Sequence, residues 1–160
     1  MALLRVMFLI LMAVASGSAS AQTCAAPIPI YHFFRYTDDT CTAQNELGTL
    51  CIFAQSPAND IIYTISLAPP FDDDFVVLVN KTAAWNAALV LIQACDGDST
   101  CPRVADAGGA GADELLDVRG LTTGTYFVVV TSAASDTSCG SYSLSVSFFI
   151  PVELQSFDID

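Results

Sequence analysis

The sequence is poor in the residues that most enzymes use for acid–base and metal chemistry. It contains one histidine, His32, in the stretch IYHFFRY, and no G-x-S-x-G, H-E-x-x-H or C-x-x-C motif. A hydrolase triad needs a base beside its nucleophile, and zinc sites usually need closely spaced cysteines or histidines. A glycosidase needs two carboxyl groups held across a cleft, whereas the acids here adjoin one another in turn-like segments. We therefore expect no catalytic residue and predict that the protein is not an enzyme.

Positive charge is also scarce. Five lysines and arginines stand against seventeen acidic residues, which gives a net charge of −12. This charge argues against nucleic acid and against an anionic membrane surface as partners. It leaves two interpretations open: solubility outside the cell, or binding of divalent cations by clustered carboxylates.

Long apolar runs are missing apart from residues 6–15, which follow Arg5 and precede the small residues 16–21. A membrane span needs about 20 apolar residues, whereas this order of charge, short apolar core and A-x-A is typical of a secretory signal peptide. We expect cleavage after Ala21 and a secreted, extracellular or cell-surface chain of about 139 residues, which suits one domain without a membrane span. Four basic residues would remain against seventeen acids, a net charge of −13.

All six cysteines follow the predicted signal peptide, so disulfides are the expected state in an oxidising compartment. Two of them enclose the acidic stretch ACDGDSTC, and we predict that Cys95 and Cys101 form a bond that pins this turn. Six cysteines allow fifteen sets of pairings, so the others stay open. Two further pairs are candidates, Cys41 with Cys51 and Cys24 with Cys139.

Period-two patterns indicate strands throughout the rest of the chain. In GSYSLSVSFF (residues 140–149) apolar and serine side chains alternate, which predicts a strand with one wet face. Residues 74–79 and 86–94 are continuous apolar runs that suit strands covered on both sides, although the alanines of the second leave a short helix possible. Crossover helices are missing, so the pattern predicts an all-β fold, a single-domain antiparallel β-sandwich or jelly roll.

One core face can be assigned from this alternation. We predict that it lies on two adjacent strands, residues 125–132 and 140–149, and consists of Tyr126, Val128, Val130, Tyr142, Leu144 and Val146.

Residues 60–147 resemble the bacterial pre-peptidase C-terminal domain. The segments that carry the resemblance are DIIYTISL, NAALVLIQACDG and ELLDVRGLTTGTYFVVVTS followed by GSYSLSVS. The resemblance implies a β-sandwich module appended to secreted hydrolases, some members of which bind calcium and fibrous protein or polysaccharide. The family's site residues have no clear matches here. We divide the chain into a signal peptide (1–21), a cysteine-containing leader (22–59), the sandwich (60–150) and a tail (151–160).

Two sets of residues are candidates for binding. Three acidic clusters in predicted turns would hold calcium if they converge, or would otherwise be solvated turns: Asp72, Asp73 and Asp74; Asp96 and Asp98; Asp113 and Glu114. Five aromatics are candidates for stacking on sugar rings, although such residues usually lie in a core: Tyr31, Phe33, Phe34, Tyr36 and Trp85.

The sequence therefore favours a secreted, non-catalytic accessory or binding module for extracellular polysaccharide or protein, with calcium as a stabilising ion. The first alternative is a structural or surface protein that assembles by adding a strand, from the leader or from the tail SFFIPVEL, to a neighbouring molecule. A hydrolase is the least favoured alternative.

Overall fold

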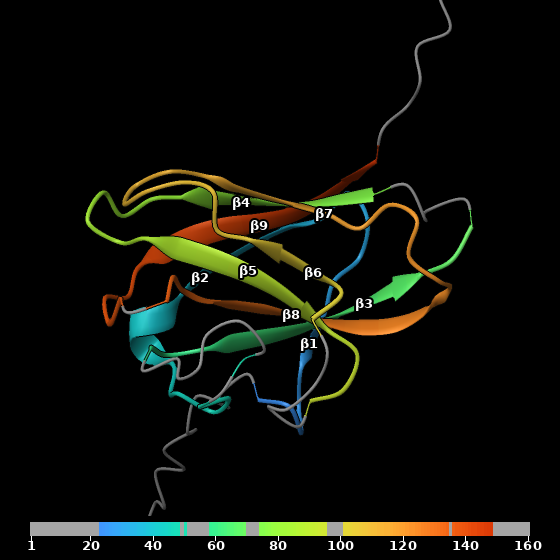
Figure 1. Ribbon diagram of the computed structural model, residues 1–160, viewed down its shortest axis with the longest axis horizontal. Coiled ribbons are helices and arrows are strands. Elements are labelled where there is room, and N and C mark those ends of the chain that lie inside the picture. Colours follow the sequence, from blue (N-terminus) through green and yellow to red (C-terminus); the bar gives the residue numbers. More distant parts are fainter. Residues whose placement is uncertain are drawn as a thin grey trace, which may run out of the picture.

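The computed structural model describes residues 23–48, 50, 58–69, 74–95, 101–134 and 136–148 (Figure 1). The predicted signal peptide and the tail 151–160 lie outside these residues and stay predictions. No helix among the described residues is long and apolar enough to cross a membrane.

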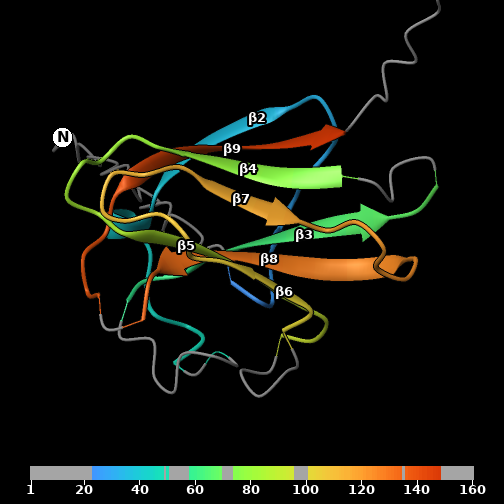
Figure 2. The ribbon, with the colours of Figure 1, turned by 45° about the horizontal axis from the view of Figure 1, so that its top comes forward.

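Two sheets pack face to face as a β-sandwich, which confirms the predicted fold class (Figure 2). The five-stranded sheet has the order β1 (Ile28–Pro29), β3 (Ile61–Leu67), β8 (Gly124–Ser132), β5 (Ala87–Ile92) and β6 (Arg103–Ala105). The four-stranded sheet has the order β2 (Arg35–Asp39), β9 (Ser141–Phe148), β4 (Asp74–Asn80) and β7 (Glu114–Asp117). Every pairing is antiparallel except that of β1 with β3.

The main core lies between the two sheets. The six residues predicted to line it, from Tyr126 on β8 to Val146 on β9, are all buried there. The expectation that these two strands are adjacent is wrong, because β8 belongs to the five-stranded sheet and β9 to the four-stranded one. Alternation specifies which face of a strand is buried but not which sheet the strand joins, so facing strands and neighbouring strands show the same pattern.

A second apolar cluster covers the outer face of the five-stranded sheet. Leu47 and Leu50 of the leader pack there against Ile62, Val90 and Val129. All six residues of β5 are buried, so this apolar run is a strand covered on both sides, as predicted, and not a helix. The leader therefore acts as a third layer over this sheet.

The outer face of the four-stranded sheet has no such layer among the described residues. Val77 on β4 is only half-buried, and Leu115 on β7, its cross-strand neighbour, is exposed. The prediction that β4 is covered on both sides is therefore wrong: its inward residues Val76 and Leu78 are fully buried, but its outward ones are not.

Disulfides tie the leader to the sandwich at two places. Cys24 is bonded to Cys95, after β5, and Cys41 is bonded to Cys139, before β9. Their Cα atoms lie 5.6 and 4.9 Å apart. Cys101 is also disulfide-bonded, and no described cysteine is free, as expected for an oxidising compartment.

The predicted pairings are wrong. Cys95 does not pair with Cys101, Cys41 does not pair with Cys51, and Cys24 does not pair with Cys139. The three pairings assumed closure of short loops or of the chain ends. The leader instead supplies an edge strand to each sheet, so its cysteines meet residues 71 and 98 positions away.

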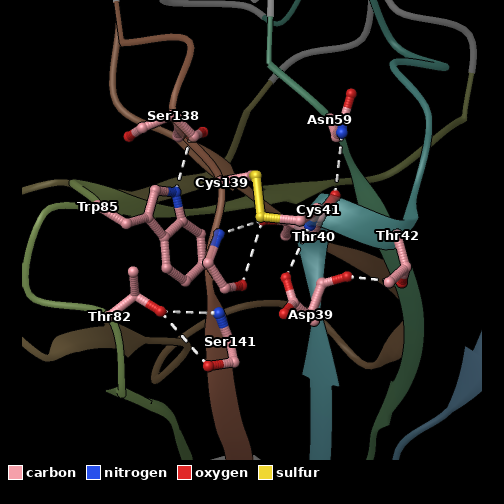
Figure 3. Close-up of a disulfide and its surroundings, with 12 residues drawn as sticks. Asp39, Thr40, Cys41, Thr42, Asn59, Thr82, Trp85, Ser138, Cys139 and Ser141 are labelled. Atoms are coloured by element: carbon pink, nitrogen blue, oxygen red, sulfur yellow. Dashed lines mark hydrogen bonds between the residues drawn. A yellow bond between two sulfur atoms is a disulfide. The ribbon is translucent and has the colours of Figure 1, made fainter.

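Hydrogen bonds surround the Cys41–Cys139 bond (Figure 3). The short 3₁₀ helix η1 (Thr40–Thr42) follows β2, and the Thr40 Oγ1 atom accepts a hydrogen bond from the Gly140 amide at 2.9 Å. The buried Trp85 indole donates to the Ser132 hydroxyl, and its ring leaves no room for a Cβ atom at position 140. The end of β2 is therefore fixed to the start of β9 by covalent and polar contacts together.

Candidate binding surface

Exposed aromatic side chains are concentrated in one short segment. The large apolar residues that the structure shows exposed are Tyr31 (59%), Phe33 (74%), Phe34 (62%) and Leu115 (57%). Three of these four lie within residues 31–34, which we call the aromatic loop. Monomeric soluble proteins rarely leave such side chains clustered at the surface without a function.

The aromatic loop carries the chain from β1 in one sheet to β2 in the other (Figure 2). Its first amide, of Tyr31, donates to the Tyr36 hydroxyl at 2.9 Å, and the Phe34 amide donates back to the Tyr31 carbonyl. Phe33 has a φ of 69°, which a residue with a side chain rarely adopts. A left-handed non-glycine residue of this kind costs on the order of 1 to 3 kcal/mol and is concentrated at functional sites.

A hollow of about 340 Å³ lies beside the loop, on the rim of the four-stranded sheet. It exists because β2 pairs with β9 only as far as Ser145, whereas β4 pairs with the other side of β9 up to Phe148. Within the described ranges, the end of β9 thus has no strand on one side. The hollow is lined by Phe33, Phe34, Arg35, Ser145, Val146 and Ser147.

The five aromatics considered for sugar stacking fall into two groups. Trp85 is completely buried in the main core, and Tyr36 packs edge-to-face on the buried Tyr63 ring, with the centroids 6.0 Å apart. Tyr31, Phe33 and Phe34 are exposed instead. Composition alone does not separate these groups, because both occur in equally apolar stretches of sequence.

The acidic pair Asp113 and Glu114 holds a loop together. Glu114 is buried, and its carboxylate accepts hydrogen bonds from the Ala107 amide at 3.2 Å and the Gly108 amide at 2.9 Å. Asp113 Oδ1 accepts from the Asn80 amide at 2.9 Å. Burial raises the pKa of Asp106 in this loop, and the negative charge of Glu114 adds to the effect. Both acids of the pair therefore have structural partners of their own.

The register of β4 gives the positions of two acidic residues along this strand. Asp74 is the first residue of β4, whereas Glu114 lies opposite Leu78, near the other end of that strand. Asp74 and Glu114 thus lie near opposite ends of β4.

Calcium binding stays a prediction. Among the described residues no three acidic, histidine or cysteine side chains form a group suited to a metal ion. Asp72, Asp73, Asp96, Asp98 and the side chain of Asp74 lie outside the described part.

A buried carboxylate that the sequence did not reveal is Asp60, which precedes β3. It is 3% exposed, and its Oδ2 atom accepts hydrogen bonds from the Leu47 and Glu46 amides at 2.9 and 3.2 Å. Its Oδ1 atom has no well-aligned donor among the described residues. Burial raises the pKa of Asp60 to about 6, against the lowering effect of these amides and of the Thr131 hydroxyl. Asp60 therefore anchors the leader segment that covers the five-stranded sheet.

Comparison with known proteins gives a likeness in structure. No protein-family model matches the chain, and no curated protein matches it. Among solved structures, the 1.0 Å crystal structure of the pre-peptidase C-terminal domain of collagenase from Bacillus anthracis is similar, with a TM-score of 0.49 and 16% identity. The match covers 75% of this chain and 93% of that one. The chain is thus similar to a domain of the family that its sequence motifs resemble, and the likeness carries no information about a ligand.

Proposed function

We propose that the protein is a secreted, non-catalytic binding module that recognises an extracellular polymer through its aromatic loop. The observation that carries this proposal is the exposure of Tyr31, Phe33 and Phe34 beside a hollow, in a chain whose other described aromatic residues are mostly buried or half-buried. Aromatic rings present a large apolar face that stacks on the apolar face of a sugar or against a peptide side chain. We infer that a polymer covers this face in the bound state.

The energetics of the loop support this proposal. Full burial of a phenylalanine side chain is worth roughly 1.5 to 3 kcal/mol, and the fold forgoes most of that at Phe33 and Phe34. It also accepts the left-handed backbone of Phe33. Binding of a ligand would bury the phenylalanine side chains that stay exposed in the folded protein, and this burial would stabilise the complex.

The two disulfides restrict the conformations that the aromatic loop can adopt. Cys24 and Cys41 lie on either side of it, and each is bonded to the sandwich. A loop that is already ordered loses little conformational entropy on binding, which favours affinity.

Strand addition, the alternative function, receives less support from the sheet edges. β1 has two residues, one of them Pro29, and β6 has three and follows Pro102. β2 carries Asp38 and Asp39. Short, charged and proline-containing edges hinder pairing with another chain. Part of the leader is also used already, because it forms β1 and β2.

A pull-down assay on insoluble polysaccharides and on collagen tests the proposal. The mature protein should be retained by at least one polymer, and a triple change of Tyr31, Phe33 and Phe34 to serine should reduce binding at least tenfold. Leu115→Ser is the matched control, since it removes an equally exposed apolar side chain from the other edge of the four-stranded sheet. Retention of the triple variant at the wild-type level would contradict the proposal.

Calcium is proposed as a stabilising ion that the acidic residues of 72–74 and 96–98 bind together. The support comes from the described strands next to these segments. β4 starts opposite Asp117, and Arg103, which pairs with Leu91 near the end of β5, donates to the Arg119 carbonyl. The start of β4 and the end of β5 are therefore at the same end of the sandwich. Millimolar calcium should raise the melting temperature more than sodium of equal ionic strength. Equal shifts with both salts would leave only a solvated acidic surface, and Asp98→Asn would then be silent.

A further inference from the structure

We propose that the hollow beside the aromatic loop takes a sugar ring bearing a carboxylate, so that the polymer bound is an acidic polysaccharide. This inference rests on the function proposed above and adds the chemical class of the ligand. Three features carry it: the charge of the hollow, the state of Arg35, and the order of side chains along the rim.

The hollow differs in charge from the rest of the molecule. The chain has seventeen acidic residues and five basic ones, yet the described residues that line the hollow include one arginine and no acid. Its other lining residues are two phenylalanines, two serines and a valine. A site of this composition complements an anionic group attached to a partly apolar ring.

The state of Arg35 supports the assignment of a carboxylate. Arg119 is paired with Asp117 through two hydrogen bonds at 2.7 and 2.9 Å, and the Arg103 guanidinium donates to the Pro102 and Arg119 carbonyls. Arg35 is exposed and makes no side-chain hydrogen bond or ion pair within the part of the chain that the structure describes. A guanidinium presents its donors in a planar fork that matches a carboxylate in a bidentate pair. Arg35 thus has its donors available for a ligand.

The order of side chains along the rim matches the groups of a uronic acid. Arg35 lies opposite Ser145, and Ser147 follows two residues further on the same face of β9, roughly 6.8 Å along the strand. Phe33 and Phe34 stand next to Arg35 in the chain and line the same hollow. A sugar ring on a phenylalanine face would therefore have a cation for its carboxylate and serine hydroxyls for its own hydroxyl groups.

The net charge of the protein restricts how such a polymer binds. The many acids repel a polyanion at long range, with a reach of about 8 Å at physiological ionic strength. Unspecific adhesion of the kind shown by basic proteins is thus suppressed. Binding has to depend on contacts within the hollow, so the substitution of one arginine should remove the preference for an acidic polymer.

The test uses the mature, disulfide-bonded protein and oligomers of galacturonate, mannuronate and hyaluronate, with their carboxyl-reduced neutral counterparts. Isothermal titration should show at least one acidic oligomer bound tenfold or more tightly than its neutral counterpart. Arg35→Gln should lower affinity for that oligomer to the level of the neutral one and leave the neutral one unchanged. Lys81→Gln is the matched control, since Lys81 is an exposed cation at the other end of β4, and should change nothing.

The outcomes separate this inference from the function on which it rests. Equal affinity for acidic and neutral oligomers, no binding of either, or a silent Arg35→Gln would overturn the inference. The binding function would still stand if Phe34→Ser abolished retention on any polymer. Equal melting temperatures of the variants and the wild type would exclude loss of folding as the cause.

Discussion

The outer faces of the two sheets differ in what covers them. The five-stranded sheet presents Ile62, Val90 and Val129 outward, and the leader packs over them with Leu47 and Leu50. The four-stranded sheet presents Ser145 and Ser147 together with Val77 and Leu115, and no described layer covers them. Ser143, nearer the start of β9, is buried. One sheet is therefore covered on both faces, whereas the outer face of the other is left open by the residues that the structure describes.

This difference shows how one leader segment serves two purposes. Its later part, held by the buried Asp60, closes the outer face of the five-stranded sheet. Its earlier part connects the five-stranded sheet to the four-stranded sheet and exposes three aromatic rings. The disulfides at Cys24 and Cys41 fix the earlier part at both ends, and the chain-entropy account assigns each bond about 4 to 5 kcal/mol for closures of this length.

The largest expected effect is that of reducing the disulfides. Reduction should lower the free energy of unfolding by about 2 to 5 kcal/mol or more, because the leader would then be held by noncovalent contacts alone. Urea unfolding with and without a dithiol measures the loss, and peptide mapping should find the Cys24–Cys95 and Cys41–Cys139 pairs. A Cys95–Cys101 peptide would instead restore the pairing expected from sequence and break the account of the leader as a covalently fixed layer.

Leu144→Ala should cost roughly 2 to 5 kcal/mol, since this leucine is fully buried between the sheets. Ser145→Ala, one residue further along β9 on the open outer face, should change the free energy of unfolding by less than about half a kcal/mol. Thermal and urea unfolding of the two variants compare the faces of one strand. Similar losses would mean that the face of β9 taken as open is in fact packed.

Asp60 should make the covered sheet sensitive to pH. Burial raises its pKa to about 6 from the ordinary value of 3.8, so the folded state binds the proton more tightly than the unfolded state. Its contribution to stability is therefore greatest below pH 4 and falls as the pH rises through 6, by an amount on the order of 3 kcal/mol.

Asp60→Asn tests this, because asparagine retains an oxygen for the Leu47 amide but carries no charge. The variant should be more stable than the wild type at pH 7.5, and the difference should shrink toward zero at pH 4. A difference independent of pH would show that the Asp60 carboxylate is not buried as described.

The smallest effect compares outward valines on the two sheets. Val90→Ala, under the leader, should cost roughly 2 kcal/mol, since complete burial of a valine is worth about that much. Val77→Ala, on the open face of β4, should cost less than 1 kcal/mol. Chemical denaturation of both variants measures the difference, and equal losses would show that the two outer faces are equally covered.

Patterns local to a strand were sufficient to predict much of this structure. The alternation in residues 140–149 identified the core residues of β9, and the continuous apolar run of β5 indicated cover on both sides. The similar run of β4 was misleading, because apolar residues on a partly open face look the same in sequence as buried ones.

Features that depend on topology could not be predicted from the residues. The leader joins both sheets, so its disulfide partners are set by strand order and not by spacing. Tyr31, Phe33 and Phe34 resemble core residues in composition, and only the crossing between the sheets places them at the surface. The sequence around Asp60 gives no sign that its carboxylate is buried, because the leader that covers it is not adjacent in the strand pattern.

Hydroxyl-radical footprinting read by mass spectrometry tests the central claim most directly, because it measures the exposure of both outer regions in one experiment. The account predicts strong oxidation of Tyr31, Phe33, Phe34 and Leu115, and protection of Leu47 and Leu50. A bound polymer should then protect the three aromatic residues and leave Leu115 as reactive as before. Protection of the aromatic loop without a ligand, or strong oxidation of Leu47 and Leu50 in the disulfide-bonded protein, would contradict the division into a covered sheet and an open binding rim.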